Sequence, residues 1–155
     1  GRADMGIIAP TEVTMIDNRT APYAALLLRV SLGVMLIAHG LLLKVFVFTV
    51  PGTVGFFESL GYPAILAYAV IAAEIAGGAA LIIGAFVRPI SLLLVPVLIG
   101  ATMVHAGNGW VFSAEGGGWE FPAFWTVTLV VQALLGAGAY AFKPTFAARL
   151  HPALA

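Results

Sequence analysis

Residues 29–44, RVSLGVMLIAHGLLLK, form an apolar stretch that carries an arginine, a histidine and a lysine. Ionisable side chains are expensive in hydrocarbon, and those found in membrane helices usually face the bundle interior or a polar cavity. The stretch therefore predicts a membrane helix. It also raises the question of which groups Arg29, His39 and Lys44 face.

The composition of the whole chain indicates an integral membrane protein. Of its 155 residues, 61% are hydrophobic and 9% are charged, far from the average of a soluble domain. Seven basic and seven acidic residues balance, so the charge favours no nucleic-acid partner. The sequence has no cysteine, which excludes disulfides, thiolate metal sites and covalent c-type haem attachment. We identify no metal site and no intrinsic cofactor in this sequence.

Four apolar segments are long enough to cross a bilayer, which takes about 20 residues in an α-helix. They lie at roughly residues 22–48, 63–87, 89–112 and 121–142. We therefore predict an all-α membrane protein with a bundle of four transmembrane helices in contact with lipid. The connector at 51–63, PGTVGFFESLGYP, is too short to cross, so we expect an interfacial or re-entrant segment between the first two helices.

The expected organisation is one four-helix transmembrane domain over residues 15–150, followed by a tail at 151–155. Residues 1–14, GRADMGIIAPTEVT, show no periodic pattern. We interpret them as an expression remnant or a disordered leader, with Met15 as the native start.

The distribution of charge along the chain predicts the orientation of the bundle. One side carries the basic residues Arg19, Arg88, Lys143 and Arg149, and the other side carries Glu58, Glu115 and Glu120. Basic residues concentrate on the cytoplasmic side. We therefore expect a multi-pass protein of the bacterial cytoplasmic membrane with both termini in the cytoplasm. Trp110, Trp119 and Trp125 then suit the outer interface, with stacking on a ligand as the lesser option.

Each predicted helix has one face of polar and small residues at about 100° per residue. At about 1.5 Å per residue, Arg29 lies roughly 10 Å from the cytoplasmic boundary, and Glu74 and Gln132 lie roughly 16 Å from the outer one. Because Glu74 is the only acid within the predicted spans, we expect it to form a salt bridge with Arg29. Such a pair either fixes helix register or relays protons.

His39 and His105 come out at one depth, roughly 25 Å above the cytoplasmic boundary. We expect them to border one cavity in the outer leaflet with Asn108 and with Lys44, closed by a glycine loop and Trp119. Three roles stay open for the histidines: hydrogen-bonded packing residues, ligands of a quinone or other substrate, and, with least weight, axial ligands of haem. For Lys44 the simpler alternative is a lysine that extends to the interface.

A series of short motifs resembles the DoxX family of small four-helix bacterial membrane proteins. The motifs are Arg29, Gly33, His39-Gly40 and Lys44; Phe56-Phe57 and Gly61-Tyr62-Pro63; Glu74, Gly77-Gly78, Gly84 and Arg88; His105; and Gly136-Ala137-Gly138. The resemblance covers about residues 22–143. It implies a redox setting and an oxidoreductase partner, because the family takes its name from a membrane subunit associated with thiosulfate:quinone oxidoreductase.

The resulting hypothesis is a membrane subunit of a redox system that binds a quinone-like or other small apolar substrate in the outer half of the bundle. The candidate catalytic residues are His39, His105 and Glu74, and the candidate substrate-binding residues are Arg29, Lys44, Asn108, Trp119 and Gln132. No dinucleotide fingerprint or flavin motif is visible, so electrons would come from a partner protein or a bound cofactor.

Two alternatives from other classes stay open. One is a non-catalytic scaffold that anchors an oxidoreductase partner. The other, less favoured, is a small-solute carrier formed by a homo-oligomer, which an absent inverted repeat argues against. The quinone or other material that accompanies the purified chain would discriminate between these hypotheses.

Overall fold

The computed structural model describes residues 16–143, 149 and 151, and its described part is helical without a strand. The proposed leader at 1–14, Met15 and most of the tail at 151–155 lie outside the described residues. The elements are α1 (Ala21–Ile37), the π-helix η1 (Ala38–Val47), α2 (Val50–Ser59), α3 (Ala64–Ile83), α4 (Val87–His105), the 3₁₀ turn η2 (Ala106–Asn108) and α5 (Glu120–Leu135). The predicted all-α class is confirmed.

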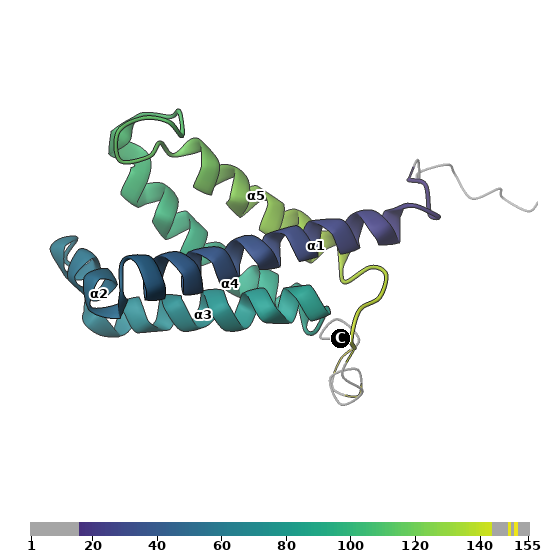
Figure 1. The fold of residues 1–155 in the computed structure, drawn as a ribbon. Helices are drawn as coiled ribbons and strands as arrows, with labels where there is room; N and C mark the ends of the chain where they lie inside the picture. Colours follow the sequence, from purple (N-terminus) through teal and green to yellow (C-terminus); the bar gives the residue numbers. More distant parts are fainter. Residues whose placement is uncertain (1–15, 144–148, 150, 152–155) are drawn as a thin grey trace, which may run out of the picture.

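The helices form two antiparallel pairs, α1 and η1 with α3, and α4 with α5 (Figure 1). The pairs lie together near the end of α3 and diverge toward the end that carries α2 and the loop before α5 (Figure 1). After α5 the chain returns to the start of α1, where the Ala139 N–H donates to Pro22 O at 2.9 Å. The Phe142 N–H donates to Ile83 O at 2.9 Å. The two ends of residues 16–143 therefore lie at the same end of the bundle.

Glycines set the close approach of α1 and η1 to α3. A Cβ atom placed on Gly33 would lie 2.6 Å from Gly78 O, and one on Gly78 would lie 2.8 Å from Gly33 O. Farther along, a Cβ on Gly40 would lie 2.8 Å from the Cβ of Glu74. Small residues let membrane helices pack backbone against backbone. The predicted packing face of small residues is confirmed for this pair.

Three helical stretches are long and apolar enough to cross a membrane: Ala21–Val47, Ala64–Ile83 and Val87–Asn108. The fourth predicted span is too long, because α5 has 16 residues and ends at Leu135 rather than near residue 142. Gly136 and Gly138 adopt φ angles of 81° and 74°, which turn the chain out of the helix. The third predicted span is also too long, since the helical stretch ends at Asn108 rather than at 112.

The connector between the first two spans contains the ten-residue helix α2. Its N-cap is Thr49, whose Oγ1 accepts from the Gly52 N–H at 3.2 Å, and Pro51 lies in its first turn. The Thr53 hydroxyl donates to Lys44 O at 2.9 Å and so attaches α2 to η1. The helix is too short to cross a bilayer, as predicted.

Candidate functional site

Arg29 has no carboxylate partner among the described residues, so the predicted salt bridge to Glu74 is wrong. Its side chain is fully buried and donates only to backbone oxygens. The Nε atom donates to Ala137 O at 2.8 Å and Nη2 donates to Ala139 O at 2.7 Å. The Nη1 atom donates to Leu81 O at 3.1 Å and to Ile82 O at 2.6 Å.

The helix register explains this correction. Gly33 packs against Gly78 and Gly40 against Glu74, so Arg29 lies opposite the end of α3, about two turns from the carboxylate. The last carbonyls of a helix lack intrahelical donors and carry the negative end of the helix dipole. The guanidinium therefore caps α3 and also holds the segment after α5.

Arg88 acts in the same way on α5. Its Nη1 donates to Ala133 O at 3.0 Å, in the last turn of that helix. Gln132, a candidate ligand residue, is fully buried and its Nε2 donates to Ala25 O at 3.3 Å and to Gly136 O at 2.9 Å. These contacts make Gln132 part of the same helix-end structure as Arg29.

Glu74 instead pairs with Lys44. Lys44 Nζ lies 3.0 Å from Glu74 Oε2, and the two side chains are 19% and 7% exposed. Lys44 therefore does not extend away from the bundle in the way an unpaired interfacial lysine would. The pair is a charged contact inside the predicted hydrocarbon region, between the first and second spans.

Lys44 lies on the π-helical segment η1, which also contains His39 and Gly40, whereas Glu74 lies on α3. Stretches of π-helix are rare and often coincide with functional sites. The His39 Nδ1 lies 2.9 Å from Met35 O, and since a carbonyl can only accept, Nδ1 is the protonated nitrogen there. The other ring nitrogen, Nε2, is left to accept or donate a proton.

His39 also packs against aromatic rings at the start of α5. Its ring centroid lies 4.8 Å from that of Trp125 at an interplanar angle of 65°, and 6.5 Å from that of Phe121. His39 therefore connects η1, the segment that carries Lys44, to the start of α5.

His105 and Asn108 lie under the loop that precedes α5. His105 Nδ1 donates to Ala101 O at 2.7 Å, and a Cβ on Gly117 would lie 3.2 Å from the His105 ring. Asn108 Nδ2 donates to Gly116 O at 3.2 Å and to Gly117 O at 2.9 Å. The glycine loop lies against His105 and Asn108, and the two hydrogen bonds of Asn108 hold it in place.

Trp119, predicted to help close a cavity, is 41% exposed, and its backbone N–H donates to Gly109 O at 3.1 Å. This bond closes the base of the glycine loop. The shared cavity of His39 and His105 stays a prediction, because neither histidine lines the two pockets described next.

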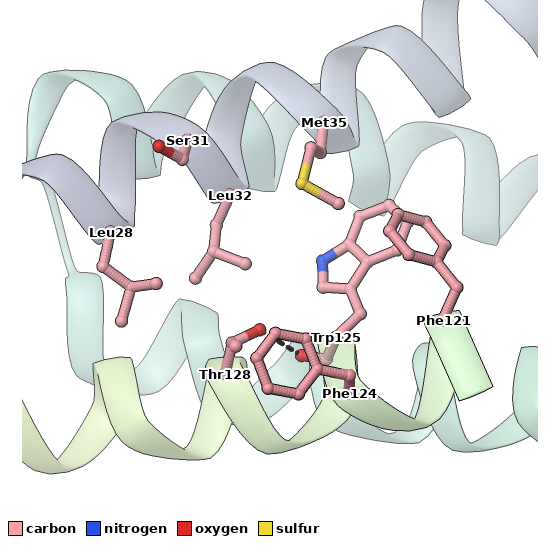
Figure 2. A pocket seen from close by; sticks show the side chains of 8 residues that line it. All are labelled: Leu28, Ser31, Leu32, Met35, Phe121, Phe124, Trp125 and Thr128. Carbon is pink, nitrogen blue, oxygen red and sulfur yellow. Dashed lines mark hydrogen bonds between the residues drawn. The ribbon is translucent and has the colours of Figure 1, made fainter.

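A pocket of about 180 Å³ lies between α1 and α5 (Figure 2). Its lining is almost entirely apolar: Leu28, Ser31, Leu32, Met35, Phe121, Phe124, Trp125 and Thr128. A second pocket, of about 290 Å³, is lined by α1 and η1 alone. The first pocket was not predicted from the sequence, although stacking on a ligand was the lesser option considered for Trp125. Within the described residues, no group of three or more His, Asp or Glu side chains could hold a metal ion.

The fold and the buried charges define the class of this molecule: a polytopic helical membrane protein. The family model for DoxX matches residues 24–107, just over half of the chain, and the chain therefore belongs to the DoxX family. The matched range contains Arg29, His39, Lys44, Glu74 and His105. It ends before α5.

One relative is a Bacillus subtilis (strain 168) protein named "Putative oxidoreductase CatD", which is 37% identical over 84 residues. The match covers 54% of this chain and 60% of that protein. The chain thus matches less than two thirds of the length of this relative. No solved structure matches the chain.

Proposed function

We propose that this chain is the membrane subunit of a redox system and binds a quinone-like ring close to the Lys44–Glu74 pair. The observation that carries the proposal is this ion pair between Lys44, on a π-helical segment of a membrane span, and Glu74, on α3, with a 3.0 Å contact and side chains that are 19% and 7% exposed. Ionisable residues inside membrane spans are rare and commonly mark proton or substrate pathways. The name of the Bacillus subtilis relative supports the redox setting.

The three side chains offer the donors and the base that quinone chemistry needs. Reduction of a quinone to a quinol takes two electrons and two protons, one proton for each carbonyl oxygen. The Lys44 ammonium has three N–H donors and directs one to Glu74, so the others can reach a substrate oxygen. His39 Nε2 and the Glu74 carboxylate can hold or deliver protons. The electrons come from an oxidoreductase partner or a bound cofactor, since no cysteine ligand and no dinucleotide fingerprint is visible in the sequence.

The competing function is a scaffold that anchors an oxidoreductase without binding its substrate. The contacts of Arg29 favour this alternative in part, because its buried guanidinium donates only to backbone oxygens and so stabilises the fold. A buried charge in this bundle therefore need not bind a substrate. The scaffold and the quinone-binding subunit differ in the role that they require of the Lys44–Glu74 pair. A scaffold needs it only for stability, whereas a quinone-binding subunit needs its charges.

The test is to purify the full chain from bacterial membranes in lipid particles and to measure the quinone extracted with it. The critical variant is K44Q/E74Q, which keeps a neutral hydrogen-bonding pair and leaves no unpaired buried charge. Loss of charge-assisted hydrogen bonds, about 1.5–3 kcal/mol each, should lower the quinone content about tenfold or more. R19Q is the matched control, because the Arg19 side chain is 92% exposed.

Thermal unfolding of the same preparations separates loss of binding from loss of fold. We expect the single variants K44Q and E74Q to unfold at lower temperature than the double variant, because each strands one buried charge. Quinone at no more than its bulk-membrane level in the unmodified protein, or equal quinone in the unmodified and double-variant proteins, would favour the scaffold.

A further inference from the structure

The pocket between α1 and α5 has a buried floor and an open rim. Leu32 and Trp125 form the floor, being 3% and 5% exposed. Phe121 and Phe124 lie at the rim and are 45% and 67% exposed. The pocket is therefore reached from the side of the bundle, between two helices, rather than from its ends.

The pocket contains one unpartnered hydrogen-bond donor. Trp125 Nε1 is buried and has no acceptor within the part of the chain that the structure describes. Figure 2 shows the indole nitrogen on the edge of the ring that faces the open space toward Leu28 and Leu32. A buried N–H without an acceptor is unfavourable, and native proteins seldom leave one.

A water molecule is a poor candidate for the missing acceptor. A buried water needs two to four polar partners. The two hydroxyl groups of the lining already donate to backbone oxygens, Ser31 to Leu27 O and Thr128 to Trp125 O, each at 2.7 Å, so they could only accept from a water and could not donate to it. The remaining lining is apolar, so the pocket favours an apolar ligand that brings an acceptor of its own.

The size of the pocket limits that ligand to about one ring. Its volume is about 180 Å³. An apolar protein cavity of about 150 Å³ is known to hold a benzene molecule. Phe121, Phe124 and Trp125 offer ring faces and edges for stacking, and the flexible Met35 thioether can adjust to an irregular outline.

We infer that this pocket binds a single planar ring that carries a carbonyl oxygen, and that Trp125 Nε1–H donates to that oxygen. The identification of the ring as a quinone headgroup rests on the proposed function. The position suits it, because His39 contacts Trp125 at a ring-centroid distance of 4.8 Å and lies on the same segment, η1, as Lys44 of the ion pair. An ester carbonyl of a membrane lipid has the same acceptor chemistry, and the experiment separates the two sources.

The experiment measures binding of two redox-inert probes to the full chain in nanodiscs by ¹⁹F NMR. The probes are 4′-fluoroacetophenone, which has a carbonyl, and 1-ethyl-4-fluorobenzene, which lacks one. In discs of ether lipids, without ester carbonyls, we expect the ketone to bind about three- to tenfold more tightly than the hydrocarbon, as one hydrogen bond allows. W125F should bind both probes equally, because it keeps a ring but removes the N–H.

Two further measurements test whether the probes bind in this pocket and which molecule supplies the carbonyl. S31F places a ring at the exposed rim and should abolish binding of both probes without changing Trp125. Repeating the titration in ester-lipid discs identifies the source of the carbonyl. Ketone binding about tenfold weaker there than in ether-lipid discs would support the site but assign it to lipid, and would overturn the quinone assignment.

The inference is overturned if W125F keeps the ketone preference, or if neither probe binds the unmodified protein. W110F, which replaces a tryptophan that does not line the pocket, should bind like the unmodified protein. Since the probes transfer no electrons, failure here leaves the proposed function standing. A failed quinone measurement with K44Q/E74Q, in turn, leaves this binding site standing.

Discussion

At the scale of single residues, the buried Arg29 and the partly buried Lys44 of the first span bind different kinds of acceptor. Arg29 binds four backbone oxygens and Lys44 binds a carboxylate. The planar guanidinium has donors in several directions, which suits carbonyls from two chain segments. The ammonium is a compact charge, which suits one carboxylate. The sequence predicted which face these residues share but not which of them Glu74 would bind.

Arg29 should be needed for stability rather than for substrate binding. In R29K the three donors of an ammonium cannot reproduce the planar arrangement of donors in the guanidinium. We therefore expect a loss of about 1.5–3 kcal/mol in the free energy of unfolding. R29M leaves several buried carbonyls unpaired and should lose about 3–5 kcal/mol, since each costs about 1–3 kcal/mol. Reversible unfolding in mixed detergent micelles measures both losses.

Two variants control this prediction. R19M removes an arginine whose side chain is 92% exposed and should change stability by less than about 0.5 kcal/mol. The exchange R29E/E74R should unfold as readily as the less stable of its single variants. Recovery of stability in that exchange would show that Arg29 and Glu74 do interact, contrary to the contacts described here.

At the scale of elements, the glycines of α1 and η1 decide which residues of α3 lie opposite. The sequence predicts a face of polar and small residues on each helix but does not determine the axial offset between the helices. That offset depends on Gly33 meeting Gly78 and on Gly40 meeting Glu74. Contacts between backbones distant in sequence leave no periodic pattern that would fix an offset. The sequence therefore could not predict the hydrogen-bond partners of Arg29.

The end of α5 was beyond sequence analysis for a related reason. Hydropathy continues through Gly136-Ala137-Gly138, so the pattern predicts a span as far as residue 142. The chain leaves the helix because the oxygens of Ala137 and Ala139 accept from Arg29. The two glycines were a signal for this turn, since their positive φ angles permit it.

The α1–α3 contact predicts which glycines tolerate a methyl group. G33A places a Cβ 2.6 Å from Gly78 O, so the helices must move apart, and we expect a loss of about 1–3 kcal/mol. G100A is the matched control within α4, where a Cβ meets nothing within 4 Å among the described residues. Alanine should stabilise that helix by about 0.5–1 kcal/mol.

Thermal unfolding of the two glycine variants in the same detergent provides the comparison. A G33A protein as stable as the unmodified chain would mean that α1 and α3 are not in backbone contact. The same preparations should show a weakened Lys44–Glu74 contact in G33A, because spreading the helices separates the pair.

At the scale of the whole molecule, the hydropathy and length of the apolar segments predicted the membrane spans. The positions of the polar residues did not predict which of them would be in contact. Three spans of the expected four are long enough to cross, and the fourth apolar helix has 16 residues, about 24 Å. The order of elements brings residue 16 and residue 143 to one end, while α2 and the glycine loop lie at the other. This topology follows from antiparallel neighbours joined by short connections, which sequence can foresee.

The last prediction concerns which end of the bundle faces the cytoplasm, and the chain is well suited to test it because it has no cysteine. Arg88 and Lys143 lie at the end that holds the start of α1, whereas Glu58 and Glu115 lie at the opposite end. Basic residues favour the cytoplasmic side. We therefore expect Asn18 in the cytoplasm and Ser59 and Ser113 outside.

The variants N18C, S59C and S113C change exposed, uncharged residues and so leave the charge distribution that orients the protein unchanged. A membrane-impermeant maleimide applied to intact bacterial cells should label S59C and S113C, and should label N18C only after lysis. Labelling of N18C alone in intact cells would invert the assignment. Labelling of S59C without S113C would contradict the fold itself, because α2 and the glycine loop would then lie on opposite sides of the membrane.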